Sequence, residues 1–194
     1  MGQTALRADA RRNRDLLLEA AAQAFAENGV DTSLEDIARR AGVGIGTLYR
    51  HFPTREALVI ATYERGVSLL CDAAPALLAE YPDKADVALE LWMERYVEYV
   101  ATKRGLAATL KAAVESHDEM FAQVRQRIHG AADSLLDAAV SSGRIRPDVQ
   151  GADLLRALGG ICMVSDSDGW QEQSMRLIKL LVDGLRYGAP AYLD

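Results

Sequence analysis

The sequence is poor in the residues that carry most redox and metal chemistry. Its 194 residues include two cysteines, Cys71 and Cys162, both in apolar surroundings, and three histidines. It contains no CxxC pair and no Cys/His cluster at metal-ligand spacing, which argues against a disulfide framework and against a bound metal. Isolated, reduced cysteines are typical of a cytoplasmic protein, and that is the compartment we expect.

Long apolar runs and catalytic signatures are also missing. No run approaches the ~20 apolar residues of a membrane helix, and the first residues lack the apolar core of a signal peptide. The sequence has no nucleophile elbow, phosphate-binding loop or HExxH motif. We therefore expect no membrane association, no cofactor and no enzyme activity. An all-α small-molecule-binding protein or enzyme is the alternative from another class.

Strand signals are absent, and the five prolines stand at boundaries. The apolar periodicity is helical throughout, so the sequence predicts an all-α fold. Pro75 is expected to bend or end the helix in which it lies. Beyond residue 54 the predicted helices cover approximately residues 55–78, 84–103, 106–114, 116–141, 149–164 and 168–187.

The charge is unevenly distributed along the chain. The net charge of −6 disfavours a nucleic-acid partner for the chain as a whole. Residues 1–55, however, hold eight Lys and Arg against seven Asp and Glu, whereas residues 56–194 hold fourteen against twenty-one. Residues 1–14 contain four arginines and one aspartate. This predicts a basic N-terminal arm that reaches phosphates or the minor groove, with a solvated tail as the alternative.

The most informative segment begins at Ser33 and combines two short helices around a tight turn. Ser33 followed by Asp36 has the form of a capping box, which places a helix start there. Gly42 supplies the left-handed residue that ends such a helix. Beyond the turn, Leu48 and Phe52 are four residues apart and can both face inward. Spacing alone leaves a plain helical hairpin and a DNA-binding element as alternatives.

The outward-facing residues of this segment suit a DNA duplex. Pro53 ends the second helix and Thr54 can cap the next one. Hydroxyls and cations hold phosphates, while only a few side chains at the start of the second helix reach base edges in the major groove. We expect Ile45, Gly46 and Thr47 to face the groove. The residues expected nearer the DNA backbone are Ser33, Tyr49, Arg50, His51 and Arg55.

The segment AGVGIGTLYRHFPTREAL resembles the recognition segment of the TetR family of bacterial transcriptional regulators. The matching residues are Ile37 and Ala38, Ala41 to Val43, Leu48 and Tyr49, Phe52, Arg55 and Leu58. Phe25 and Gly29 stand where the family's first helix buries an aromatic residue and ends. Two positions depart from the pattern: Gly44 replaces the commoner Ser cap, and Arg55 replaces the commoner Lys. Gly is only a slightly weaker cap, and Arg also holds phosphate.

The resemblance implies both the architecture and the function. It implies a three-helix DNA-binding head over residues 15–58, with a helix-turn-helix at about 33–52. A connecting helix would join this head to a larger all-α effector-binding and dimerisation domain, residues 59–194. The chain would be a dimeric repressor, released from a pseudo-palindromic double-stranded DNA operator by a small, largely apolar effector. A C-terminal domain that binds a protein partner, or no ligand, is the alternative.

The last two predicted helices offer independent support for a homodimer. Gly159 and Gly160 are adjacent inside an apolar helix, where each costs about 1 kcal/mol relative to Ala, and they suggest a close helix approach. Packing within one subunit is the alternative. The expected interface residues are Leu155, Leu158, Gly159, Ile161, Cys162, Met175, Ile178, Leu181, Val182 and Leu185.

An aromatic and sulfur-bearing cluster in the middle of the chain is the candidate effector pocket. Such pockets are mostly apolar with a few polar groups that orient the ligand, and His117 or the tyrosine hydroxyls would serve that role for a neutral, partly aromatic compound. A plain helical core is the alternative. The candidate residues are Trp92, Met93, Tyr96, Tyr99, Leu110, Val114, His117, Phe121 and Val124.

Overall fold

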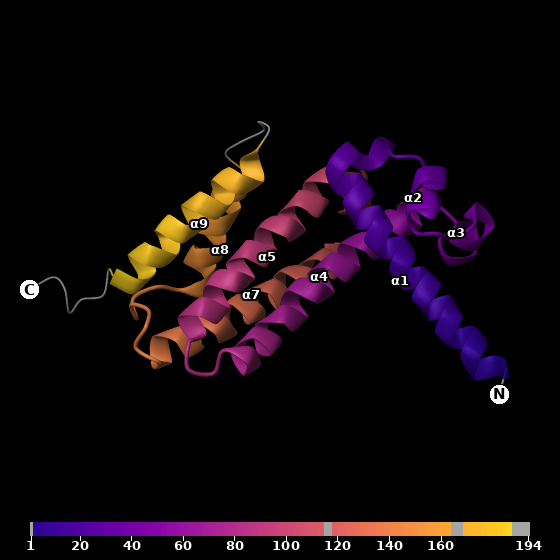
Figure 1. Cartoon of the computed structure of the whole chain (residues 1–194). Helices are drawn as coiled ribbons and strands as arrows, with labels where there is room; N and C mark the ends of the chain where they lie inside the picture. The colour runs from indigo at the N-terminus through magenta and orange to yellow at the C-terminus, as the bar shows by residue number, and fades with distance from the viewer. Residues whose placement is uncertain (1, 115–117, 164–168, 188–194) are drawn as a thin grey trace, which may run out of the picture. The chain divides into compact units, whose positions relative to one another are not determined.

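The computed structural model describes residues 2–114, 118–163 and 169–187. Across these ranges all regular elements are helical, as the sequence predicts (Figure 1). The elements are α1 (Gly2–Asn28), η1 (Gly29–Asp31), α2 (Leu34–Arg40), α3 (Ile45–His51), α4 (Arg55–Glu80), α5 (Ala85–Gly105), α6 (Ala107–Val114), α7 (Asp118–Ser141), α8 (Gly151–Met163) and α9 (Trp170–Tyr187). The first residues of the predicted helices 116–141 and 168–187, Ser116 and Asp168, lie outside the described residues.

The chain divides into two compact units, which we call the head and the body. The head comprises Met1–Gly66 and Ala101–Asp118, and the body comprises Val67–Val100 and Glu119–Asp194. Helices α4 and α5 therefore each contribute one end to each unit. From the sequence, all residues beyond Leu58 are expected to form one domain. In the structure, residues 101–118 instead belong to the head.

Within the head, helices α1, α2 and α3 contact one another. Helix α1 buries Leu18 and Phe25, and the two short helices bury Ile37 and Leu48 against it. Helices of seven residues are too short to be stable in isolation. Their persistence therefore depends on this shared core and on their caps.

Helix α4 continues through Pro75 to Glu80, so the proline does not end it. A proline removes one backbone hydrogen bond and crowds the preceding turn. Pro75 is exposed, and the helix is held on both sides of it by the buried residues Ala74 and Leu77. Packing outweighs the local cost of the proline at this position.

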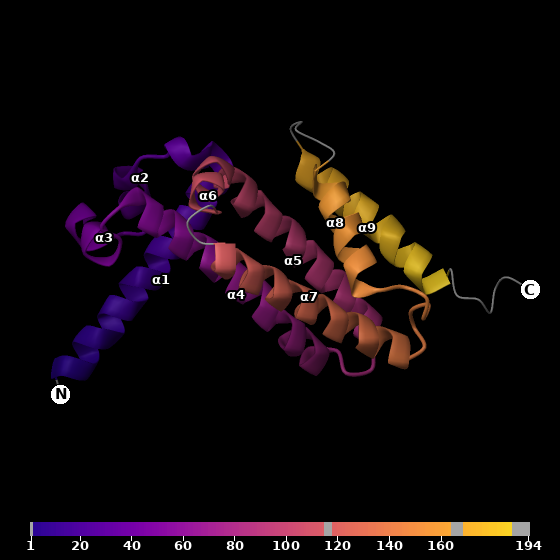
Figure 2. The same ribbon diagram turned by 180° about the vertical axis from the view of Figure 1, so that it is seen from behind.

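The body contains the long helices α4, α5 and α7, which run alongside one another in both views (Figures 1 and 2). Helices α8 and α9 pack against each other as a pair. The largest buried side chain is Trp92 of α5, whose indole N–H donates a hydrogen bond of 2.9 Å to the Leu70 carbonyl of α4. A buried indole donor needs such a partner.

An ionic cluster joins α5, α9 and the loop between α7 and α8. Asp86 is only 6% exposed, and its Oδ2 accepts a 2.9 Å hydrogen bond from Nε of Arg186. The same guanidinium lies 2.8 Å from Glu90, and Arg144 approaches Asp86 Oδ1 at 3.7 Å. Buried carboxylates require such cationic partners. The C-terminal end of α9 is thereby tied to α5.

Candidate nucleic-acid interface

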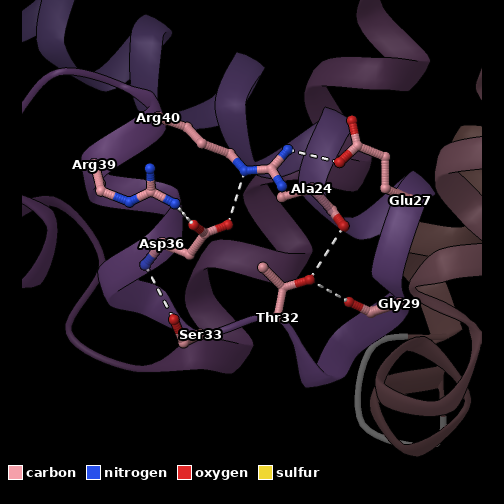
Figure 3. Close-up of polar contacts among 8 residues, drawn as sticks. All are labelled: Ala24, Glu27, Gly29, Thr32, Ser33, Asp36, Arg39 and Arg40. Atoms are coloured by element: carbon pink, nitrogen blue, oxygen red, sulfur yellow. Dashed lines mark hydrogen bonds and ion pairs between the residues drawn. The ribbon is translucent and has the colours of Figure 1, made fainter.

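Ser33 caps the first helix of the helix-turn-helix. Its Oγ accepts a 3.0 Å hydrogen bond from the backbone N–H of Asp36 (Figure 3). The cap itself is as the sequence predicts, but the reciprocal bond of a capping box is replaced by ion pairs. The Asp36 carboxylate accepts hydrogen bonds from Arg40 and Arg39. These bonds, the one from Arg40 foremost, lower the pKa of Asp36 below its ordinary value.

Two further polar contacts fix this helix against α1. Arg40 Nη1 lies 2.7 Å from Glu27 Oε2, and this hydrogen bond is the main cause that raises the pKa of Arg40. The buried hydroxyl of Thr32 is shared between the carbonyls of Ala24, at 3.1 Å, and Gly29, at 3.0 Å (Figure 3). Sequence reasoning identified neither contact, because each depends on how two helices meet.

The turn after α2 has the hydrogen-bond pattern of a Schellman motif. Gly42 has φ of 70°, its N–H bonds to the Arg39 carbonyl, and the Val43 N–H bonds to the Ala38 carbonyl. Only glycine adopts this left-handed conformation without strain. The turn that the sequence predicts at Gly42 is therefore confirmed, and it sets the direction in which α3 leaves.

Helix α3 presents one face to solvent. It begins after Gly44, whose backbone is extended and whose carbonyl accepts the Thr47 N–H at 2.8 Å. Leu48 and the C-cap residue Phe52 are buried, as the sequence predicts. Ile45 is 37% exposed and Tyr49 is 47% exposed, so both side chains are accessible on the outward face of α3.

The remaining candidate residues lie on or beside this exposed face. Gly46 and Arg50 are exposed, while Thr47 and His51 are half-buried at its margin. Exposed Ser33 begins α2, and half-buried Arg55 begins α4 after the cap in which Thr54 Oγ1 accepts the Ala57 N–H at 3.1 Å. The outward residues combine one aliphatic group, hydroxyls and cations, and the carboxylate of Asp36 in the neighbouring helix α2 is paired with Arg39 and Arg40. This composition suits an anionic duplex.

Helix α1 contributes a contact that no sequence pattern indicated. The Arg14 guanidinium lies 5.4 Å from the centroid of the Phe52 ring, a cation–π arrangement. Nearby, Arg65 of α4 bonds Asp15 at 3.1 Å. The N-terminal half of α1 is thus held at the C-terminal end of α3.

The candidate effector residues are divided between the two units. In the body, Trp92, Met93, Tyr99, Phe121 and Val124 are buried and Tyr96 is half-buried. The Tyr96 ring lies 6.1 Å from Trp92 and 5.7 Å from Tyr99 by ring centroids, which makes a ladder of three aromatic rings. Leu110 is buried and belongs to the head. His117 and the side chain of Val114 lie outside the described residues.

The candidate dimer residues fall into two groups. The buried side chains already pack within the subunit: Leu155, Leu158, Cys162, Ile178, Val182 and Leu185. Half-buried positions are Gly159, Ile161, Met175 and Leu181. Two large side chains that sequence reasoning did not select are the most exposed: Met163 at 80% and Leu180 at 68%. A pattern of apolar periodicity selects the inward face of a helix, which explains this omission.

Neither a metal-binding cluster nor a membrane-spanning helix occurs in the described part of the chain. Among residues 2–114, 118–163 and 169–187, no three His, Cys, Asp or Glu side chains are grouped so as to hold a metal ion. Over those same ranges, no helix combines the length and the apolar character needed to cross a membrane.

A glycine-turned pair of short helices whose second helix is exposed is typical of the class of helix-turn-helix transcription regulators. Comparison with protein families agrees with this class. Residues 17–62 match the family described as bacterial regulatory proteins, tetR family, and residues 84–187 match the transcriptional regulator SbtR-like, C-terminal domain. The chain belongs to the TetR family and is a DNA-binding transcriptional regulator.

Solved structures of the family share the whole fold. A TetR transcriptional regulator from Streptomyces coelicolor is 46% identical, with a TM-score of 0.81 over 89% of this chain and 98% of that chain. A TetR transcription regulatory protein from Mycobacterium vanbaalenii is 36% identical, with a TM-score of 0.73 over 93% and 99%. An HTH-type transcriptional regulator of Staphylococcus aureus strain USA300 is 27% identical over 108 residues, 55% of this chain. The chain spans 58% of the length of the curated relatives it matches.

Proposed function

We propose that the chain is a homodimeric repressor that binds a pseudo-palindromic operator and is released from it by a small, largely apolar effector. The observation that carries DNA binding is the exposed face of α3, fixed by the glycine turn and by the buried anchors Leu48 and Phe52. Because its target is the chromosome, we infer that the chain acts in the bacterial cytoplasm as a regulator and not as an enzyme.

Two sets of residues divide the work at the DNA. Ile45, Gly46 and Thr47, at the start of α3, face base edges, and the aliphatic Ile45 suits the methyl group of a thymine. The phosphate set comprises Ser33, Tyr49, Arg50, His51 and Arg55. Contacts to phosphates fix register and orientation, whereas contacts to base edges determine sequence preference.

Substitutions in the two sets separate these roles. Arg55→Ala removes a phosphate contact, so it weakens binding to operator and random duplex alike and lowers the slope of log K against log salt by about 0.9. Ile45→Ala reduces the ratio of the affinity for operator to the affinity for random duplex, and it leaves the slope of log K against log salt unchanged. Arg125→Ala, an exposed cation on α7, is the control. Fluorescence anisotropy of labelled duplexes measures all three, and an unchanged slope in Arg55→Ala would remove that residue from the phosphate set.

The outward face of α8 and α9 supports the homodimer. A Cβ added at Gly160 or Gly184 meets no atom of the subunit within 4 Å, so nothing inside the subunit requires glycine there. Met163 and Leu180 are exposed beside them on the same helix pair. Small residues next to exposed apolar ones permit the close packing of a helix pair against its symmetry mate.

A charge on this face tests the dimer. Leu180→Glu places a carboxylate in the proposed interface and is expected to convert dimer to monomer in analytical ultracentrifugation. Leu69→Glu, a similarly exposed leucine on α4, is expected to leave the dimer intact. A dimeric Leu180→Glu variant would contradict an interface formed by α8 and α9.

The aromatic ladder of the body is the proposed effector site. A thermal-shift screen of neutral aromatic compounds should find saturable stabilisation, which reaches about 2.7 kcal/mol at a ligand concentration of 100 Kd. By thermodynamic reciprocity, a compound that releases DNA must bind the DNA complex less well than the free dimer. Equal affinity for the two forms would exclude release by that compound.

A further inference from the structure

Helix α1 carries arginines on the face by which it packs into the head. Arg7, Arg11 and Arg14 are spaced four and three residues apart. The same spacing continues along the helix to the buried residues Leu18, Ala21 and Phe25. Residues at these intervals lie on one side of a helix. The packed side of α1 therefore becomes an arginine face, Arg7, Arg11 and Arg14, where the helix runs past the rest of the head.

The arginine face lies on the same side of α1 as α3. Arg14 sits over the ring of Phe52, the residue that ends α3, at 5.4 Å. Figures 1 and 2 both show the first turns of α1 projecting beyond α2 and α3. Arg7 and Arg11 are exposed on this projecting part. They are presented next to the helix that is proposed to enter the major groove.

The acidic residues of this part of α1 do not neutralise the face. Asp9 is two residues from both Arg7 and Arg11, which places it on the other side of the helix. Asp15 accepts a hydrogen bond from Arg65 of α4. The arginine face therefore combines strong positive charge, exposure and a fixed helical geometry.

We propose that the arginine face binds phosphates of the operator duplex that flank the half-site contacted by α3. The proposal rests on DNA binding by α3. At 1.5 Å per residue, Arg7 to Arg14 spans about 10 Å, and a duplex presents roughly six phosphate charges over that length. The guanidinium fork matches phosphate geometry. The partner is the flanking duplex because the face is continuous with the DNA-binding face of α3.

Arg11 and Arg12 provide a matched pair of variants. They are adjacent, both exposed and equal in charge, but Arg12 lies about a quarter turn away from the arginine face. Arg11→Ala, Arg12→Ala and the double variant R7A/R11A are compared in the full-length chain. Alanine has a higher helix propensity than arginine, so α1 is retained, and circular dichroism checks this.

The probe is a duplex enriched from a random-sequence pool by the purified chain. Two versions of this duplex are compared. The long duplex extends about one helical turn, roughly 10 base pairs, beyond each half-site, and the trimmed duplex ends at the half-sites. On the long duplex, Arg11→Ala should lower the slope of log K against log salt by about 0.9, and R7A/R11A by about 1.8. Arg12→Ala should leave the slope unchanged. On the trimmed duplex all variants should match the parent chain.

Three results would contradict the proposal in different ways. Equal changes of the salt slope in Arg11→Ala and Arg12→Ala would show a general effect of charge and would overturn phosphate binding by the arginine face. If the R7A/R11A variant showed the same salt slope as the parent chain on the long duplex, the arginine face would also be overturned. DNA binding by α3 would not be affected by that result. A parent chain that binds no duplex would overturn the proposed function and this inference together.

Discussion

The head contains exposed arginines on α1 and α3, whereas the body contains one arginine that is largely buried among carboxylates. In the head, Arg7, Arg11 and Arg50 extend into solvent. In the body, the guanidinium of Arg186 is largely buried and bound by the carboxylates of Asp86 and Glu90. A count of charges in each unit hides this difference. Cations that neutralise carboxylates within the body contribute little field at its surface, whereas Arg7, Arg11 and Arg50 of the head are exposed to an anionic partner.

The two units also differ in what holds their helices. The head relies on seven-residue helices, which require caps, a glycine turn and shared hydroxyl bonds. The body relies on long helices around Trp92, with one buried ionic cluster at Asp86. Loss of a single polar contact should therefore destabilise either unit. In the body it should affect stability alone, whereas in the head it should also affect DNA binding.

The largest effect is expected from breaking the ionic cluster. Arg186→Leu leaves buried Asp86 and half-buried Glu90 without their principal cation, and should lower the free energy of unfolding by about 3–5 kcal/mol. Urea denaturation followed by tryptophan fluorescence measures this. Arg156→Leu, which breaks the exposed pair with Asp153, should cost less than about 1 kcal/mol. If Arg186→Leu and Arg156→Leu lowered the free energy of unfolding equally, the distinction between buried and surface arginines would be wrong.

The next effect tests whether the end of α5 belongs to the head. A Cβ at Gly105 would lie 1.9 Å from the carbonyl oxygen of Phe25 in α1. Gly105→Ala must displace backbone and should cost about 1–3 kcal/mol. Gly130→Ala, in α7 with open space around it, should instead stabilise by up to about 1 kcal/mol. A neutral Gly105→Ala would argue that α1 and α5 do not pack so closely.

A smaller effect is expected from the buried hydroxyl that joins α1 to α2. Thr32→Val keeps the shape but loses the bonds to the Ala24 and Gly29 carbonyls, at a cost of about 1–2 kcal/mol. The control Thr62→Val loses only a bond to the Leu58 carbonyl within α4, and should cost less. DNA affinity should fall in Thr32→Val at temperatures near its melting point. If Thr32→Val left the free energy of unfolding unchanged, the stability of the head would not depend on this hydroxyl.

The smallest effect concerns pH. The arginine partners lower the pKa of Asp36 in the folded chain below its ordinary value of 3.8. The resulting stabilisation is fully present above the ordinary pKa and is lost as pH falls through the lowered pKa. Asp36→Asn lacks it at every pH. The stability difference between the two chains should therefore be constant near neutrality and shrink only in strong acid, which acid-unfolding curves would detect.

Local chemistry explains which features could be predicted. The Ser33 cap, the turn at Gly42 and the inward Leu48 are each determined by a few consecutive residues, and the structure confirms all three. The contact of Arg14 with Phe52 and that of Arg186 with Asp86 join distant segments. No local pattern encodes such pairs, since they depend on tertiary packing.

The candidate site shows the same division. Helix periodicity places Ile45 and Tyr49 outward, as the structure does. The pairing of Asp36 with Arg39 and Arg40, in place of the reciprocal capping bond, depends on rotamers that the sequence does not specify. Periodicity likewise selected the inward faces of α8 and α9, so the exposed Met163 and Leu180 emerged only from the structure.

The most direct test of the account is selection of bound duplexes from a random-sequence DNA pool with the purified full-length chain. If exposed α3 helices of a symmetric dimer read DNA, the enriched sequences should share two inverted half-sites with a fixed spacing near one helical turn or a multiple of it. Enrichment should be lost with Ile45→Ala paired with Arg50→Ala. A pool that shows no consensus after selection, or a single unpaired half-site, would contradict the proposed dimeric operator-binding repressor.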